Sequence, residues 1–173
     1  MNRPLDRWRA YLLLAGGCLA GGLVGALFDQ LTATISPEYF LEGKGLDVSS
    51  LPFRWAVAKV GFLGALPLGA LITGAALIDS QSSPGFVWRG WLARLAWRVA
   101  ATVAVCAVLM PTFDPFAVRA IGEWPSEVTS RLLACWGMHV GAYLGVLIAV
   151  LAELLRSPWG EGASRRAAWR SPR

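Results

Sequence analysis

Long apolar runs, separated by short stretches that carry the charges, make up most of the chain. A helix that crosses the hydrocarbon core of a membrane needs about 20 mainly apolar residues. Four stretches reach or approach that length, at about residues 10–28, 55–78, 92–113 and 132–155. The pattern therefore predicts an all-α fold, a bundle of four transmembrane helices that forms one domain over residues 1–156.

The third of these runs is the shortest in uncharged residues. Its uncharged part, from Val99 to Phe113, is too short to span the bilayer and must be extended backwards through Arg94 and Arg98. These arginines are four residues apart, so they lie on one helical face and can extend their charged ends to the membrane surface. The alternative is a separate surface helix followed by a shorter buried segment.

Basic residues are distributed unequally between the two sides of the predicted bundle. The outer loops contain Lys44, Arg54, Arg119 and Arg131, whereas eleven arginines lie on the opposite side: Arg3, Arg7, Arg9, Arg89, Arg94, Arg98, Arg156, Arg165, Arg166, Arg170 and Arg173. Because Lys and Arg accumulate on the side that is not translocated, both termini are expected in the cytoplasm. We expect this basic side to contact anionic lipid headgroups of the bilayer.

The two ends of the chain fit the same arrangement. The first apolar run could be a secretory signal, but its 19 uncharged residues exceed the usual apolar region of a signal peptide. No convincing cleavage site of small residues follows it, so we expect it to be a membrane helix. Residues 157–173 are basic and rich in Ser, Gly and Ala, which predicts a flexible tail.

Composition favours a membrane protein over a soluble one or a nucleic-acid-binding one. The 173 residues are 55% hydrophobic and 16% charged, which is unusual for a soluble domain of this size. The net charge is +5, but the basic residues flank apolar runs instead of forming a patch, so no nucleic-acid partner is expected. Cys18, Cys106 and Cys135 all lie in apolar runs without a CxxC motif, so neither a disulfide framework nor a metal site is predicted.

Two sets of glycines recur at a spacing of four residues, one set in the first predicted helix and one in the fourth. The sets are Gly17, Gly21 and Gly25, and Gly137, Gly141 and Gly145. Glycine faces let two helix backbones approach closely, and this close packing is a main source of helix association in lipid. We expect each set to make a tight helix contact, in the fourth helix together with Tyr143, and the two sets can pair with one another.

The first outer loop, residues 29–54, contains a short helical motif. Segment 36–43 starts with Ser-Pro-Glu, which suits the first turn of a helix, and ends with a glycine, which suits its C-terminus. We predict a short interfacial helix in which Tyr39 and Phe40 lie at headgroup depth or cover the outer end of the bundle, with Glu38 near water. The alternative is a loop that binds a partner, since long loops in small domains are often functional.

Three ionisable residues in or beside apolar runs are the candidates for chemistry. Asp29 ends the first run, Lys59 lies near the start of the second and His139 lies in the fourth. On the predicted topology all three are on the outer side and can converge below the short interfacial helix. A functional interpretation is a proton- or ion-responsive site, because such groups are costly at membrane depth. In a structural interpretation, Lys59 extends outward or pairs with Asp29, and neutral His139 donates one hydrogen bond between helices.

Signatures of common enzyme classes do not occur in the sequence. It has one histidine, no HExxH, no GxSxG and no glycine-rich phosphate loop. We therefore predict no catalytic residue, no cofactor and no metal site.

Two segments resemble a family of small, functionally uncharacterised bacterial membrane proteins. Residues 29–40 end in Ile-Ser-Pro-Glu-Tyr-Phe, which follows the first helix in that family, and residues 138–145 contain His-x-x-x-Tyr-x-Gly, which lies in its last helix. The resemblance implies a multi-pass protein of the bacterial inner membrane. It also implies importance for a set of residues, namely Asp29, Glu38, Tyr39, His139 and Tyr143. It brings no activity.

Two classes of function follow from these features. The first is a non-enzymatic accessory or scaffold subunit of a membrane protein complex, whose partners are other membrane subunits or further copies of the chain. The alternative is a small oligomeric channel or a proton- or ion-coupled transporter that uses Asp29, Lys59 and His139. A third, weaker interpretation is an enzyme that acts with a ligand-borne metal or on a lipid substrate.

Overall fold

The structure is a computed structural model that describes residues 6–82, 86–113 and 125–156. This part of the chain forms the helices α1 (Arg7–Ile35), η1 (Tyr39–Gly43), α2 (Phe53–Ser82), α3 (Trp88–Phe113) and α5 (Ser126–Arg156). The four α-helices are each long and apolar enough to cross a membrane. The prediction of an all-helical fold with four helices of this kind is therefore confirmed. The predicted tail, residues 157–173, and Arg119 lie outside the described residues.

The helices extend beyond the apolar runs from which they were predicted. Helix α1, for example, begins at Arg7 and continues to Ile35, because the polar residues at both ends of the run keep a helical backbone. Helix α3 is continuous from Trp88 to Phe113 and includes both Arg94 and Arg98. The alternative of a surface helix followed by a separate buried segment is therefore wrong.

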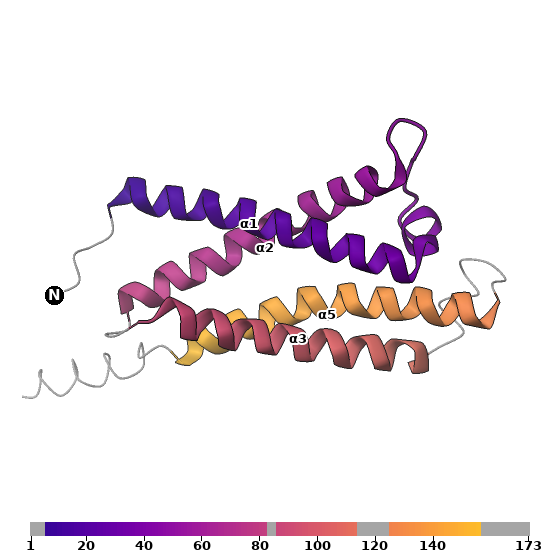
Figure 1. The fold of residues 1–173 in the computed structure, drawn as a ribbon. Helices are drawn as coiled ribbons and strands as arrows, with labels where there is room; N and C mark the ends of the chain where they lie inside the picture. Colours follow the sequence, from indigo (N-terminus) through magenta and orange to yellow (C-terminus); the bar gives the residue numbers. More distant parts are fainter. Residues whose placement is uncertain (1–5, 83–85, 114–124, 157–173) are drawn as a thin grey trace, which may run out of the picture.

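The four long helices form two hairpins that lie against one another (Figure 1). Helix α1 packs mainly on α2, and α3 packs mainly on α5, while α2 and α5 make a smaller contact between the hairpins. Helices that follow one another along the chain are usually neighbours in space, because short connections keep them together. The extensive helix contacts therefore lie within each hairpin, and the hairpins touch over less of their length.

The glycines of α1 lie against α2, where the two backbones approach closely. A β-carbon at Gly21 would lie 2.7 Å from the α-carbon of Gly69, and one at Gly25 would lie 2.4 Å from the carbonyl oxygen of Gly61. Gly17 lies in the same way against Thr73 and Gly69. A larger residue at Gly21 or Gly25 would therefore force the two helices apart.

The glycines of α5 lie against α3. A β-carbon at Gly141 would lie 2.7 Å from the α-carbon of Val103, and one at Gly137 would lie 2.3 Å from the carbonyl oxygen of Cys106. Gly145 faces Val99 and Thr102. The two glycine sets therefore do not meet one another, because each is used inside its own hairpin.

Two apolar clusters connect the hairpins, one near each end of the bundle. The cluster that joins α2, α3 and α5 contains Ala75, Ala76, Trp91, Leu95, Val146, Ala149 and Val150. The cluster that joins α1, η1, α2 and α5 contains Ala33, Tyr39, Phe40, Val57, Leu132 and Cys135. We call the first the lower cluster and the second the upper cluster, and we use 'upper' for the end of the bundle at which η1 lies. The middle of the interface between the hairpins, which lies between the two clusters, is less tightly filled.

The loop after α1 folds back onto the bundle through η1. This helix is a single turn of the wider π type, in which the amide of Lys44 donates to the carbonyl oxygen of Tyr39 at 3.0 Å. The side chains of Tyr39 and Phe40 are 8% and 0% exposed, so they cover the end of the bundle instead of lying on its surface. The hydroxyl of Ser36 donates to the carboxylate of Glu38 at 2.9 Å, not to a backbone amide as expected of an N-cap.

Candidate functional site

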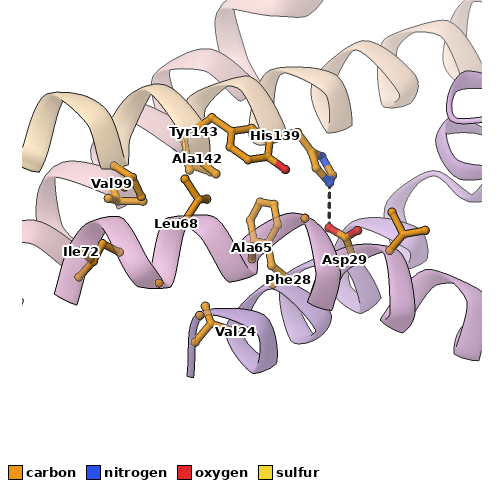
Figure 2. A pocket seen from close by; sticks show the side chains of 18 of the residues that line it. Val24, Phe28, Asp29, Ala65, Leu68, Ile72, Val99, His139, Ala142 and Tyr143 are labelled. Carbon is orange, nitrogen blue, oxygen red and sulfur yellow. Dashed lines mark hydrogen bonds and ion pairs between the residues drawn. The ribbon is translucent and has the colours of Figure 1, made fainter. Parts of the chain in front are cut away.

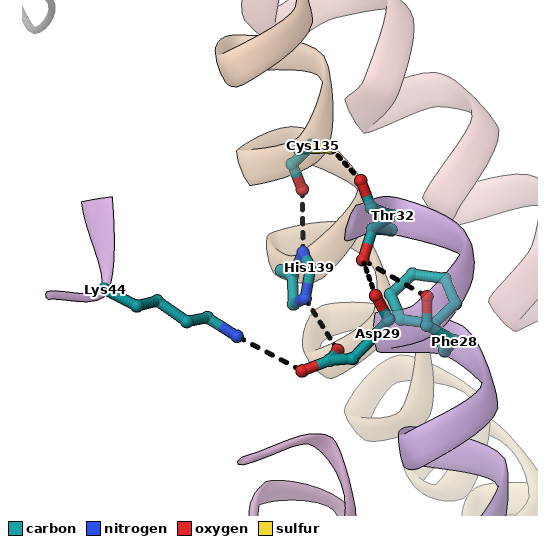
Figure 3. A network of polar contacts seen from close by, with 6 residues as sticks. All are labelled: Phe28, Asp29, Thr32, Lys44, Cys135 and His139. Atoms are coloured by element: carbon teal, nitrogen blue, oxygen red, sulfur yellow. Dashed lines mark hydrogen bonds and ion pairs between the residues drawn. The ribbon is translucent and has the colours of Figure 1, made fainter. Parts of the chain in front are cut away.

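Asp29 and His139 form a buried hydrogen-bonded pair between the two hairpins. Asp29 lies in the last turns of α1 and His139 in the middle part of α5, 110 residues away along the chain. The Nε2 atom of His139 is 2.9 Å from Oδ1 of Asp29, and both residues are buried (Figure 3). The predicted convergence of these two residues is therefore present in the structure.

The second ring nitrogen of His139 determines how the pair holds its protons. Its Nδ1 atom is 2.8 Å from the carbonyl oxygen of Cys135, which can only accept a hydrogen bond, so Nδ1 carries a proton. The hydrogen bond between Nε2 and Asp29 then needs a second proton between those two atoms. Either an imidazolium faces a carboxylate, or a neutral imidazole faces a carboxylic acid. In both forms the two side chains share one proton.

Lys44, from the loop after η1, completes the polar group. Its Nζ atom is 3.4 Å from Oδ2 of Asp29 and lies 4.7 Å and 5.1 Å from the ring centroids of Phe40 and Tyr39. A cation in this position is attracted both by the carboxylate and by the aromatic faces. With one shared proton, Asp29, His139 and Lys44 together carry a net charge of +1.

Lys59, which was predicted to join this group, lies elsewhere. It is exposed on α2, two residues before Gly61, which faces Asp29. Two residues correspond to a rotation of about 200° around an α-helix, so the side of α2 that carries Lys59 points away from α1. The prediction that Lys59 joins Asp29 and His139 was therefore wrong, whereas the alternative in which Lys59 extends outward agrees with its exposure. Lys44 supplies the cation in its place.

Three aromatic rings surround the imidazole of His139. The ring centroids of Tyr39, Phe28 and Phe40 lie 4.7 Å, 5.3 Å and 6.0 Å from that of His139. Burial, and then the charge of Asp29, raises the pKa of Tyr39, which lies in η1 outside the membrane-length helices, well above its ordinary value. Tyr39 is therefore neutral near the pair and contributes shielding from water instead of charge.

Hydrogen bonds from side chains to backbone carbonyl oxygens fix the two helices that carry the pair. The thiol of Cys135 on α5 donates to the carbonyl oxygen of Thr32 on α1 at 3.3 Å. The hydroxyl of Thr32 in turn lies 3.1 Å from the carbonyl oxygen of Phe28 and 3.2 Å from that of Asp29. These contacts hold α1 and α5 in register directly beside the Asp29–His139 hydrogen bond.

A cavity of about 410 Å³ extends from the pair into the gap between the hairpins. Its walls are mostly apolar and come from α1, α2, α3 and α5, as Figure 2 shows for Leu68, Ile72 and Val99. Small residues of α2, among them Gly64 and Ala65, leave the space open. Asp29, Lys44 and His139 lie together in its wall, so the cavity has a polar end and a long apolar part.

Tyr143 and Glu38, two residues singled out in the sequence, have different positions. Tyr143 lines the cavity, and its hydroxyl oxygen would lie 3.3 Å from a β-carbon at Gly64 (Figure 2). Tyr143 therefore borders an open space. Its place in the glycine-rich segment of α5 had predicted a tight helix contact instead. Glu38, the residue before η1, lies 4.0 Å from Arg131, so this pair links the start of η1 to the upper end of α5.

A second polar cluster at the opposite end of α5 was missed in the sequence. Glu153 is 2% exposed and accepts hydrogen bonds from Nη2 of Arg94 at 2.7 Å and from Nη1 of Arg98. The two arginines, which were expected to extend to the membrane surface, thus bind a carboxylate between α3 and α5. The sequence did contain a signal for this cluster. Glu153 lies near the end of the fourth apolar run, and Arg94 and Arg98, four residues apart, lie near the start of the third, at the same side of the predicted membrane.

No metal-binding cluster occurs in the described part of the chain, where no three His, Cys, Asp or Glu side chains lie close enough to hold an ion. The chemical groups of the site are one acid–base pair, one lysine and the hydroxyl of Tyr143. Comparison of the chain with protein-family models, with curated proteins and with solved structures found no match.

Proposed function

We propose that the chain is a proton-coupled transporter in which Asp29 and His139 form a single proton-binding site. The observation that supports this proposal is the hydrogen bond from His139 Nδ1 to the Cys135 carbonyl, because it leaves one proton shared by two buried groups. Ionisable groups at membrane depth are costly and tend to mark proton or ion pathways. Histidine is also the side chain that changes charge most readily near neutral pH.

The position of the cavity supports transport over a purely structural role. The proton-binding pair lies in the wall of the cavity, so a ligand in that space would sense the charge of the pair. The upper and lower clusters hold the two hairpins together on either side of this space. Alternating access requires that the two ends of such a space open in turn, and rocking of one hairpin against the other would open one end at a time.

For the orientation, we propose that the pair faces the outside of a bacterial inner membrane and that both termini are cytoplasmic. The ends of the helices opposite the pair carry most of the basic residues that the structure describes: Arg7, Arg9, Arg89, Arg94, Arg98 and Arg156. The end with the pair carries Lys44, Arg54, Lys59 and Arg131. In this orientation η1 lies at the outer interface and the basic end contacts anionic headgroups. Since four helices seldom enclose a pathway alone, we propose that the chain self-associates.

Proton movement in vesicles tests this function. Purified protein is reconstituted into liposomes that contain a pH-sensitive dye, and an outward or inward pH gradient is imposed. Wild-type protein should move protons, and His139→Ala should reduce the rate at least tenfold because the shared proton has no site. Lys59→Ala, an exposed position on α2, is the matched control and should keep the wild-type rate. A wild-type rate equal to that of empty liposomes, without a substrate and also with oleate added to both, would exclude the proposal.

An accessory-subunit function, also non-enzymatic, is the second candidate. A β-carbon at Gly16 of α1 or at Gly74 of α2 would meet nothing within 4 Å, so these helices have small residues at which a helix of another subunit could approach closely. Native mass spectrometry of gently solubilised protein would then show a partner at fixed stoichiometry. Such a partner together with no proton movement would favour this candidate over transport.

A further inference from the structure

The shape of the cavity limits the kind of ligand that it can hold. Along α2 it extends from Val60 to Ile72, thirteen residues whose α-carbons span about 18 Å of helix. Its volume of about 410 Å³ lies near the lower end of the range of roughly 300–1,000 Å³ that is usual for small-molecule sites. A long, narrow and apolar space of this size suits a single hydrocarbon chain better than a compact polar molecule or a lipid with two chains.

The polar end of the cavity carries a net positive charge. The charges of Asp29, His139 and Lys44, with the one shared proton, sum to +1. The nearby side chains of Tyr39, Tyr143 and Cys135 carry no charge in their protonated forms. Glu38 and Arg131, which lie near this end, form a pair with each other, so their charges cancel. An anion that enters the cavity is therefore attracted to the end at which Lys44 lies.

Lys44 has hydrogen-bonding capacity left for such an anion. An ammonium group has three donors, and within the described residues the Nζ of Lys44 donates only to Asp29 Oδ2, at a long distance of 3.4 Å. Tyr143 adds a hydroxyl group to the cavity wall. The headgroup of a ligand can therefore bind Lys44 and Tyr143 without displacing the Asp29–His139 hydrogen bond.

We infer that the cavity binds a single-chain lipid anion, a long-chain carboxylate. Its chain lies along the apolar wall formed by α2 and α5, and its headgroup lies at Lys44 beside the Asp29–His139 pair. A second proton on the pair would raise the local charge to +2 and strengthen the attraction, which links anion binding to proton uptake. This inference rests on the proposed transport function and names the substrate class of the same site.

Equilibrium binding to the full chain in a neutral detergent tests the inference, with oleate and oleyl alcohol as probes. Both have the same hydrocarbon chain, but only oleate carries a charge. Oleate should bind with a stoichiometry of one and at least about tenfold more tightly than the alcohol, since a hydrogen bond to a charged group contributes about 1.5–3 kcal/mol. Equal affinity for the two probes would overturn the inference.

Substitutions separate the chain-binding part of the cavity from the charged end. Gly64→Leu places a side chain in the cavity and should abolish binding of both probes, whereas Gly74→Leu, on the same helix but away from the cavity, should leave both affinities unchanged. Lys44→Gln should lower the affinity for oleate to that for oleyl alcohol. Ala142→Leu fills the cavity from α5 and replaces Gly64→Leu if that variant does not fold. Undiminished binding to a cavity-filled, folded variant would contradict the proposed location.

Binding and transport can fail separately in these experiments. A preference for oleate that depends on Lys44, found without proton movement, would support the ligand class and exclude transport. Proton movement that depends on His139, found without a preference for oleate, would overturn the ligand class alone.

Discussion

His139 illustrates how one backbone contact sets the chemistry of a side chain. A neutral imidazole has one donor and one acceptor, and the carbonyl oxygen of Cys135 takes the donor at Nδ1. The Nε2 atom must then share a proton with Asp29, which it faces at 2.9 Å. If Nδ1 faced a donor instead, neutral His139 could donate from Nε2 to an ionised Asp29 without any extra proton.

The stability of the protein should fall at alkaline pH through Tyr39. The raised pKa means that the neutral phenol is favoured in the folded state, so its contribution is complete below the ordinary tyrosine pKa of about 10 and is lost as the pH rises beyond it. Thermal unfolding in detergent at increasing pH measures this loss. Tyr39→Phe, which keeps the ring but cannot ionise, should show a smaller alkaline loss than wild type, and an identical loss in both proteins would argue against this origin.

At the scale of elements, the glycines explain why the helices pair as they do. On α1 they lie at Gly17, Gly21 and Gly25, and on α2 the facing positions Gly61, Ala65 and Gly69 are also small and also four residues apart. Because the helices are antiparallel, each small residue of one meets a small residue of the other. This match brings the backbones of the first hairpin together along one face of each helix.

Gly21→Leu should therefore weaken the first hairpin. A leucine there would collide with the backbone of α2 at Gly69, whereas Gly16→Leu on the same helix meets open space. We expect a clear loss of thermal stability in detergent for Gly21→Leu. Gly16→Leu should match wild type or exceed it slightly, because leucine favours the helix by up to about 1 kcal/mol relative to glycine. Gly141→Leu on α5 should behave like Gly21→Leu, and wild-type stability in both would contradict this packing.

At the scale of the whole molecule, two hairpins joined at both ends leave a cavity between them. Tight glycine contacts hold each hairpin together, while the upper and lower clusters hold one hairpin to the other. The larger interface within each hairpin and the smaller one between them make relative movement of the hairpins the easiest change of shape. The pair at Asp29 and His139 bridges this weaker interface, so its protonation can influence that movement.

The orientation of the molecule can be tested by labelling single cysteines in a variant without the native cysteines. Ser49→Cys lies in the exposed loop between η1 and α2, and Arg9→Cys lies at the opposite end of the bundle, at the start of α1. In intact cells, a thiol reagent that does not cross membranes should label the cysteine at position 49 and not that at position 9. The reverse pattern would invert the proposed topology.

The amino-acid sequence by itself determined the four helices, because the length of an apolar run is a local property that the thickness of the membrane makes decisive. It also singled out Asp29 and His139, since ionisable groups are rare in such runs. The tertiary structure alone decided which lysine joins them, because that choice depends on the rotation of α2 and on the path of the loop that carries Lys44. It likewise decided that each glycine set packs within its own hairpin and that a cavity lies between the hairpins, because both follow from contacts between residues far apart in the chain.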